Sequence, residues 1–504
     1  MPKLSYGAAL RWLAAEAPER LAAICGGQPM TRRELELRSN RLARAYQQLG
    51  VGPESRVTLA LPNSLEFLVA CMAVWKLGAS PQPISARLPA KEREAILELA
   101  QPALVVGVEK GEYPRFRSVA AGFVPSAALS DAPLPDVVPQ HVRTMTSGGS
   151  TGRPKLIVDL TPALCDPELA ENFMQPRGVA LAPGPLYHAG PFIVAWQCML
   201  SGGTLVLMER FDAEQALALV AQHRVDWVLF VPTMMQRIAK LADDVRSKHD
   251  VTSLRRVMCS GAPSPAWLKR FWIEWLGAEK IFEAYGGTER IAGTVIDGVE
   301  WLAHPGSVGK PPPGRMMRAQ RPDGSVCAPG EAGEIYMKPA SGQGTTYRYI
   351  GAAPVATPDG WETLGDVGWF DAAGYLYLAD RKTDMILVGG SNVYPAEVEA
   401  AIDAHPAVRS SAVIGLPDDD LGSRVHALVD APAGVTPDSL RAHLAERLVA
   451  YKIPRSFEFV NEPLRDDAGK LRRSALREAR LAPSSGTGAG LPNLGDTPTS
   501  ARRT

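Results

Sequence analysis

The sequence predicts an α/β protein, with a large N-terminal lobe of layered, largely parallel sheets and a small α+β domain after it. In the first 380 residues, short apolar runs ending in turn residues alternate with helical patterns, which favours parallel strands joined by helices. After Asp380 the pattern becomes that of a compact α+β unit. We therefore predict a large domain at 1–380, a small domain at 381–482 and a tail at 483–504. The tail is rich in Pro, Gly, Ser and Thr and lacks aromatic residues, so it is expected to be disordered.

The first elements have clear start and stop signals. Thr31 and Glu34 form a capping-box pair, and apolar residues then recur at helical spacing until Gly50. Residues 56–61 read as a strand, and Asn63 is expected to cap a helix that ends near Gly78. Further strands are expected at 179–182, 204–207, 227–231 and 256–259, with a helix from Asp212 to Val220.

The small domain contains fewer elements. Helices are expected at 396–404 and 438–448, and β-rich runs at 412–416 and 425–429. The carboxyl ends of the parallel strands in the large lobe are the expected place for ligands.

Composition excludes several classes of function. Lys plus Arg and Asp plus Glu are each 54, so the chain has no bulk field for nucleic acid or an anionic membrane. The six cysteines show no Cys-x-x-Cys or metal-ligand spacing and are expected to be reduced, small and buried. The apolar stretch at 181–200 is interrupted by Pro183, Pro185 and Pro191, so no membrane span is expected. The N-terminal segment lacks a signal-peptide core, and a cytoplasmic protein is expected.

One Gly/Ser-rich loop has the composition of a polyphosphate site. Three glycines free the backbone to turn N–H groups inward, hydroxyls add donors and a lysine adds charge. Pro154-Lys155 excludes a Walker loop, and the loop by itself is also consistent with a flexible linker. Its candidate ligand-binding residues are Ser147, Gly148, Gly149, Ser150, Thr151, Gly152 and Lys155.

Other motifs are weak one by one. Tyr285-Gly-Gly-Thr288-Glu289 follows a β-rich run, and its hydroxyl and carboxylate suit a phosphate and Mg²⁺. Asp366 could accept bonds from ribose hydroxyls, and Arg381 could donate to a sugar or phosphate. Lys470 alone would be read as a surface lysine and His188 as a core histidine.

Their order in one chain is far more specific. With Gly389-Gly390 downstream of Arg381, the motifs make the chain resemble the adenylate-forming (AMP-binding) enzymes, in the acyl-CoA synthetase branch, over residues 10–480. The resemblance implies an ATP-dependent acid–thiol ligase that converts a carboxylate to an acyl-adenylate and passes the acyl group to coenzyme A. ATP, Mg²⁺ and coenzyme A are the implied cofactors, and lipid or natural-product metabolism is the implied setting.

The resemblance also assigns roles to residues. Ser150, Thr151 and Lys155 would hold the β- and γ-phosphates, Thr288 the α-phosphate and Glu289 the Mg²⁺ ion. Asp366 and Arg381 would hold the ribose, and Lys470 would bridge the carboxylate and the α-phosphate, where a cation offsets anion repulsion. The implied adenine slot, with Tyr285 against the ring, comprises Gly261, Ala262, Pro263, Glu283, Ala284, Tyr285 and Gly286.

In such enzymes the small domain rotates after adenylation. The rotation would withdraw Lys470 and bring Gly389 and Gly390 to the thiol channel, where a glycine leaves room for pantetheine. The pivot maps near Lys382 or Thr383, and His188 matches a gate between the acyl pocket and that channel.

Four positions depart from the common pattern without removing a charged catalytic group: Leu156, Leu364, Thr383 and Asp467. They leave two alternatives to a complete ligase: an enzyme that only forms the thioester from an adenylate made by a partner, and a non-catalytic nucleotide-binding protein.

The acid is expected to be bulky and apolar. No carboxylate follows His188 to pair an amino-acid ammonium, and Phe192, Ile193 and Trp196 suggest a roomy apolar pocket. The amino-acid sequence of the Gly/Ser-rich loop at 147–155 is similar to that of ligases for alicyclic acids such as bile, steroid and diterpenoid acids. Free coenzyme A is the expected acceptor, and a homodimer is one open alternative for the assembly.

Overall fold

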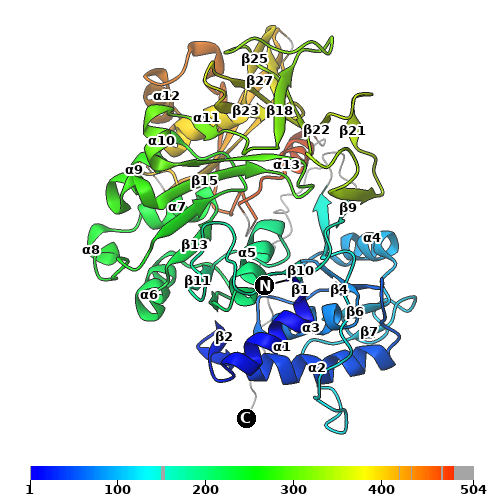
Figure 1. Ribbon diagram of the computed structural model, residues 1–504. Coiled ribbons are helices and arrows are strands. Elements are labelled where there is room, and N and C mark those ends of the chain that lie inside the picture. The colour runs from blue at the N-terminus through cyan, green and yellow to red at the C-terminus, as the bar shows by residue number, and fades with distance from the viewer. Residues whose placement is uncertain (1, 149–153, 419, 433, 467–468, 482–504) are drawn as a thin grey trace, which may run out of the picture.

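The computed structural model describes residues 2–148, 154–418, 420–432, 434–466 and 469–481. Figure 1 shows an N-terminal region of helices and short strands, a central sheet with helices, and a C-terminal region above it. The expected tail at 483–504 lies outside the described residues.

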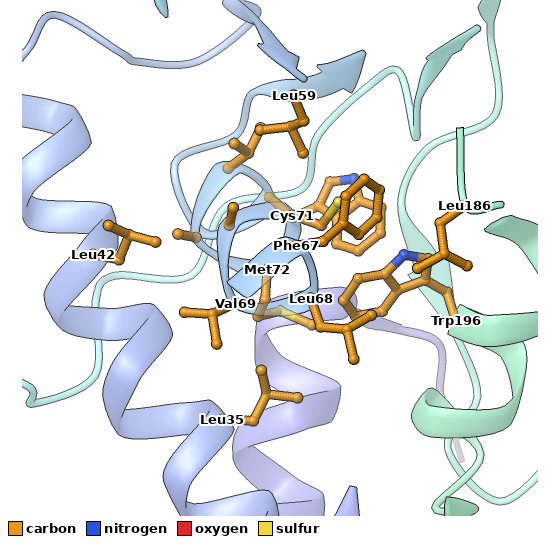
Figure 2. Packing of buried hydrophobic residues seen from close by; sticks show 14 of the residues in the cluster. Leu35, Leu42, Leu59, Phe67, Leu68, Val69, Cys71, Met72, Leu186 and Trp196 are labelled. Carbon is orange, nitrogen blue, oxygen red and sulfur yellow. The ribbon is translucent and has the colours of Figure 1, made fainter. Parts of the chain in front are cut away.

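The N-terminal region contains a four-stranded parallel sheet in the order β5-β4-β6-β7. Its strands are β4 (Arg56–Leu59), β5 (Ser80–Pro83), β6 (Leu104–Val106) and β7 (Ser118–Val119), and the helices beside it are α1 (Tyr6–Glu16), α2 (Arg32–Gln48), α3 (Leu65–Lys76) and α4 (Ala90–Ala100). Helix α3 is buried for most of its length, and Figure 2 shows Phe67 and Trp196 among the side chains of the cluster around it. This buried cluster joins α3 to the helix that follows His188.

The central sheet has eight strands. Ligands were expected at the carboxyl ends of its parallel strands. It runs β16-β15-β14-β13-β11-β12-β2-β3, parallel from β15 to β2 and antiparallel at both ends. The strands are β2 (Leu21–Cys25), β3 (Gln28–Thr31), β11 (Val179–Ala182), β12 (Thr204–Leu207), β13 (Trp227–Phe230), β14 (Arg256–Cys259), β15 (Ile281–Gly286) and β16 (Gly293–Asp297). The accompanying helices are α5 (Ala189–Leu200), α6 (Ala213–His223), α7 (Pro232–Ala239), α8 (Asp243–Arg246), α9 (Ala266–Leu276), η1 (Ala278–Lys280) and α10 (Gly298–Ala303).

The remaining sheets of this lobe are antiparallel. One has six strands, namely β17 (Ser307–Gly309), β18 (Met316–Gln320), β19 (Gly333–Lys338), β21 (Val355–Ala356), β22 (Glu362–Phe370) and β23 (Leu376–Arg381). Another has the order β20-β9-β8, with β8 (Thr144–Gly148), β9 (Pro154–Asp159) and β20 (Tyr347–Ile350). A short pair joins β1 (Leu4–Ser5) to β10 (Leu164–Cys165).

The C-terminal region is built from a hairpin, a three-stranded sheet and helices. These elements are β24 (Ile386–Val388), β25 (Ser391–Val393), α11 (Pro395–Asp403), β26 (Ser410–Asp418), β27 (Gly422–Asp430), α12 (Pro437–Ala445), η2 (Ala450–Lys452), β28 (Ser456–Val460) and α13 (Arg473–Leu481). The predicted helices at 396–404 and 438–448 correspond to α11 and α12.

Several local predictions are confirmed, and two are wrong. The capping box of Thr31 and Glu34 is present, and Asp212 caps α6. Helix α3 is capped by Ser64 and not by Asn63. The expectation that every cysteine is buried fails for Cys165 and Cys327, which are partly exposed.

Within the described ranges, no helix combines the length and the apolar character needed to cross a bilayer.

Candidate active site

The carboxyl ends of β14 and β15 lie side by side and form one wall of the candidate site. Residues 261–263 follow β14, and the hydroxyl of Ser260 donates to the carbonyl of Ala284 at 2.7 Å. Gly261 has a φ of +92°, a backbone conformation that an L side chain rarely adopts. The structure thus places 261–263, which follow β14, beside 283–286 of β15.

The segment 283–289 runs from the end of strand β15 into the turn that follows it. The Glu283 carboxylate is buried and ion-paired with Lys269, so its charge is compensated inside the protein. Gly286 ends β15, and Thr288 and Glu289 lie on the turn that follows. The turn therefore presents Thr288 and Glu289 at the carboxyl edge of the sheet.

Tyr285, Asp366 and Arg381 form a second cluster. The Tyr285 hydroxyl donates to Asp366 Oδ2 at 2.6 Å, and Arg381 Nε lies 3.4 Å from Asp366 Oδ1. Asp366 and Arg381 face each other in register on β22 and β23. Burial raises the pKa of Tyr285, and the Asp366 charge raises it further, so the hydroxyl keeps its proton. A carboxylate has about four lone-pair sites, so Asp366 retains capacity for further donors.

Lys155, Glu289 and Tyr349 form a third cluster. Lys155 Nζ lies 3.7 Å from Glu289 Oε1 and 3.9 Å from the centre of the Tyr349 ring. The Tyr349 hydroxyl donates to Glu289 Oε1 at 2.6 Å, and Glu289 is only 6% exposed. Burial lowers the pKa of Lys155, and the Glu289 charge partly opposes that shift. Tyr349 was missed by sequence reasoning because no motif spacing links it to Glu289.

The Gly/Ser-rich loop connects two paired strands. Ser147 and Gly148 end β8 opposite Lys155 and Pro154 of β9, so the ladder positions both ends of the loop. Gly149, Ser150, Thr151 and Gly152, the centre of the predicted phosphate loop, lie outside the described residues.

His188 precedes helix α5 and is neutral at ordinary pH. Burial lowers its pKa to about 3, and the charge of Lys470 adds to the shift. Its buried Nε2 has no hydrogen-bond partner within the described residues. The segment before it is held by Asn63, which donates to the carbonyls of Gly184 and Met208 and accepts from the backbone of Leu186. Asn63, expected as a helix cap, therefore positions the approach to His188 instead.

Lys470 of the C-terminal region lies near these clusters and His188, and we call the place where they come together the nucleotide cleft. The charges of Glu289 and Arg381 act on its ammonium, and its own charge acts on His188. The adjoining Gly469 packs on the start of α7 so closely that an added Cβ would lie 2.7 Å from Thr233 Oγ1. Lys470 retains exposed surface, yet the protein around its ammonium lowers its pKa by desolvation. The structure thus brings together the lysine and the motifs that precede it by 180 residues or more.

Gly389 and Gly390 lie away from the nucleotide cleft, in a hairpin of the C-terminal region. They form the two-residue turn between β24 and β25, with φ values of +53° and +83°, as a type I′ hairpin turn requires. Figure 1 shows β25 well away from the end of β15. This arrangement places Lys470, and not the glycine pair, at the cleft.

The apolar residues after His188 are arranged differently from the expectation. Phe192 and Trp196 are each 2% exposed and pack against Trp75 in the N-terminal core. They are therefore unavailable as walls of an open acyl pocket, whereas Ile193 keeps partial exposure. The physical reason is the helix period, since residues 192 and 196 share one face and that face packs on α3.

Two of the unusual motif positions serve packing. Leu156 is fully buried in a cluster with residues of α4 and β6. The side chain of Leu364 closes on Gly287, leaving no room there for a Cβ. Both side chains fill apolar space beside the clusters, and neither departure removes a charged catalytic group.

Comparison with known proteins agrees with this geometry. Residues 10–349 match the family described as AMP-binding enzyme, and residues 397–470 match the AMP-binding enzyme C-terminal domain. A feruloyl-CoA synthase from Amycolatopsis sp is 34% identical over 92% of this chain and 96% of its own. A 2-succinylbenzoate–CoA ligase from Bacillus licheniformis is 29% identical over 92% of this chain and 98% of its own.

Solved structures agree as well. The o-succinylbenzoate CoA synthetase MenE from Bacillus subtilis, in complex with its acyl-adenylate intermediate, has a TM-score of 0.79 and 26% identity, covering 95% of this chain and 99% of its own. The complex of the same synthetase with ATP and magnesium has a TM-score of 0.79 and 27% identity. The match covers 93% of this chain and 98% of the synthetase. The predicted fold class and the resemblance to adenylate-forming enzymes are confirmed, and this chain belongs to the AMP-binding enzyme family.

Proposed function

We propose that this protein is an ATP-dependent acyl-CoA ligase that activates a bulky apolar carboxylic acid as its acyl-adenylate and transfers the acyl group to coenzyme A. One observation carries the proposal: Lys470, from the small domain, lies near enough to Glu289, Arg381 and His188 for their charges to act on one another. The relatives that match over nearly the whole chain are ligases of the same class by name.

In the first half-reaction, a carboxylate oxygen attacks the α-phosphorus of ATP and the bond to pyrophosphate breaks. Lys155 would hold the outer phosphates and Thr288 the α-phosphate. Lys470 would sit between the two anions, where its charge offsets a repulsion that is strong away from water. Asp366 and Arg381 would hold the ribose, and the bond from Tyr285 to Asp366 would orient the aromatic ring for adenine.

The residues present fit a Mg²⁺ ion that is held mainly by phosphates. Within the described part of the chain, no cluster of three His, Cys, Asp or Glu side chains could hold a metal. Mg²⁺ commonly binds one or two carboxylates together with substrate phosphates, and the buried Glu289 supplies one such carboxylate. When bound, the ion would neutralise phosphate charge.

In the second half-reaction, the thiol of coenzyme A attacks the acyl carbonyl and AMP leaves. Lys470 would have to leave the cleft and the hairpin of Gly389 and Gly390 would have to approach it. His188, being neutral, would act as a gate by its shape and position.

We place the boundary between the two domains at Arg381 and the pivot at Thr383. Lys382 binds back to the large lobe, through its backbone to Gly365 at 2.8 Å and its side chain to Glu334 at 3.0 Å. Asp384 binds Arg473 of the small domain at 2.7 Å. Among the described residues, no hydrophobic cluster includes members from both sides of this boundary.

Lys240 of the large lobe is expected to hold the small domain in the adenylating orientation. Its ammonium donates to the carbonyl of Asp403 at 3.3 Å and to that of Val408, so it lies at the C-terminal end of α11, where a cation is favoured. We expect Lys240→Met to slow adenylate formation about 10-fold, since a charged hydrogen bond contributes roughly 1.5–3 kcal/mol. Thioester formation from preformed adenylate should stay the same or rise.

Lys248→Met is the matched control, because Lys248 is an exposed lysine of the same lobe paired only loosely with Asp244 at 3.9 Å. Stopped-flow measurement of each half-reaction gives the two rates. Equal slowing of both steps by Lys240→Met would point to general destabilisation and contradict the positioning role.

An acid panel decides between the complete ligase and its alternatives. Aromatic, alicyclic and long-chain acids are incubated with ATP and coenzyme A, and pyrophosphate and thioester are measured separately. We expect both products with a bulky apolar acid. Thioester from synthetic adenylate without any pyrophosphate release would favour the thioester-only enzyme, and nucleotide binding without either product would favour the non-catalytic protein.

We place the protein in the cytoplasm. All six cysteines are unpaired, as is usual in a reducing compartment.

A further inference from the structure

A hollow of about 330 Å³ lies beside the outer end of β9 and has no part in the proposed reaction. Its walls come from the end of β9, the turn after Glu289, the loop before β18 and the loop before β20. The lining residues are Thr161, Arg290, Pro313, Gly314, Arg315, Ala340, Ser341, Thr345 and Thr346, and none of them is acidic.

Two arginines are fixed at this hollow by groups of the protein itself. Arg290 Nη1 lies 3.1 Å from Thr161 Oγ1 and 3.4 Å from Asp159 Oδ2. Arg315 Nη1 donates to the carbonyls of Arg290 and Ile291 at 3.2 and 3.1 Å. Each guanidinium thus uses one nitrogen to hold its position, and its remaining N–H groups have no partner among the described residues.

The charge around the hollow is not balanced. Asp159 is 2% exposed and is already paired at 3.0 Å with the buried Arg143. Arg290 therefore shares a carboxylate that Arg143 neutralises, and Arg315 has no carboxylate partner within the described residues. Two guanidinium groups share one carboxylate and Arg315 adds a third positive charge at the hollow, so an anion bound there would offset their repulsion.

The backbone separates this hollow from the nucleotide cleft. Arg290 has a φ of +57°, which is uncommon for a residue with a side chain. Glu289 meets Lys155 near the start of β9, whereas Arg290 meets Asp159 four residues later, about 13 Å away at 3.3 Å per residue. Glu289 and Arg290 are consecutive residues, yet they contact opposite ends of strand β9.

A buried hydroxyl at the hollow also lacks a partner. Thr346 Oγ1 is inaccessible to water and has no hydrogen bond within the described residues. Thr161, Ser341 and Thr345 add three more hydroxyls, of which the last two lie 2.5 Å apart. A buried polar group without a partner costs stability, and rotation of the Thr346 side chain toward a bound acceptor would remove that cost.

We propose that this hollow binds the phosphate groups of a small phosphorylated molecule, at a site separate from the nucleotide cleft. The planar guanidinium matches phosphate oxygens two at a time, and several hydroxyls suit a group with many acceptors. The volume lies within the range of small-molecule sites and exceeds what one phosphate ion needs. Pyrophosphate and the phosphorylated end of coenzyme A share this chemistry.

Binding is tested by isothermal titration calorimetry on the full chain, at fixed low ionic strength, with pyrophosphate and coenzyme A as separate probes. All proteins carry Lys155→Ala, which weakens phosphate binding in the nucleotide cleft. We expect one binding event in this background and at least a 10-fold loss of affinity when Arg290→Gln and Arg315→Gln are added. The control Arg33→Gln removes an exposed arginine that pairs with Glu19, and it should change nothing.

Thr346→Val separates binding from folding. Because the hydroxyl has no partner in the free protein, its removal should leave the melting temperature equal or higher while it lowers the affinity about 3- to 10-fold. Weaker binding of 3′-dephospho-coenzyme A than of coenzyme A would identify the 3′-phosphate as the bound group, and equal binding would point to the diphosphate. Absence of binding in the Lys155→Ala background, or unchanged affinity in the double arginine variant, would overturn the proposal.

Discussion

Lys470→Ala should lower the rate of acyl-adenylate formation by about 10²–10³-fold, the loss expected when one preorganised group that stabilises developing charge is removed. Lys470 is carried by the small domain, and the charges of Glu289 and Arg381 in the large lobe act on its ammonium together with that of Asp466. Thioester formation from preformed adenylate should keep its rate, because Lys470 would be withdrawn for that step. Pyrophosphate exchange measures the first half-reaction, and chromatography of the thioester measures the second.

The pH dependence gives a second measure of the same role. The pKa of Lys470 lies below its usual 10.5, and only the cation can bridge two anions. Adenylate formation should therefore decline as pH rises through this lowered pKa, while the second half-reaction should show no such decline. Lys470→Arg should move the decline to higher pH, since arginine keeps its proton.

The control for Lys470 is another lysine of the small domain. Lys452 is paired with Glu397 at 2.7 Å outside the cleft, so Lys452→Ala should leave both half-reactions unchanged. If Lys470→Ala forms adenylate at the wild-type rate, the assigned role is wrong.

Glu289→Gln should also slow adenylate formation by about 10²–10³-fold, because a carboxylate ligand to Mg²⁺ is lost and metal ions supply several kcal/mol of charge stabilisation. The amide keeps the shape of the side chain and can still accept the bond from Tyr349. The Mg²⁺ concentration that gives half the maximal rate should rise at least about 10-fold. Initial rates measured over a range of Mg²⁺ concentrations at saturating ATP test both statements.

Glu362→Gln is a closely matched control. Glu362 is also a buried carboxylate, 1% exposed, and accepts a bond of 2.5 Å from Tyr347, two residues before Tyr349. It has no contact with Lys155, so its replacement should leave the Mg²⁺ dependence unchanged. An equal change in both variants would mean that loss of a buried charge, and not loss of a metal ligand, caused the effect.

The local elements were predicted well because their signals lie within a few residues. The capping box of Thr31 and Glu34 is a contact between residues three apart, and Asp212 caps α6 in the same way. Apolar runs such as Trp227–Phe230 and Arg256–Cys259 are strands with the expected bounds or within one residue of them. Asn63 shows the limit, because an adjacent serine competes for the cap and the decisive partners of Asn63 lie more than 120 residues away.

The sequence named candidate site residues, but it did not show which of them are in contact. The motifs named Lys155, Glu289, Asp366 and Arg381, and the structure joins them in pairs. Tyr349 carries no signal in the sequence, since it reaches Glu289 only because β20 pairs with β9. Phe192 and Trp196 were assigned to a pocket from their composition, and packing against Trp75 decided otherwise.

By itself the sequence determined many of the strands and helices, the turns that carry polar groups and the family to which the chain belongs. These depend on hydrogen bonds, capping and apolar periodicity over short spans, which the local sequence encodes directly. The tertiary structure alone decided that Lys470 comes within reach of the Glu289 charge, that Lys240 caps α11, and that Arg290 and Arg315 face one hollow. Such contacts join residues far apart in the chain, and their energies arise only when sheet pairing and core packing have brought the segments together.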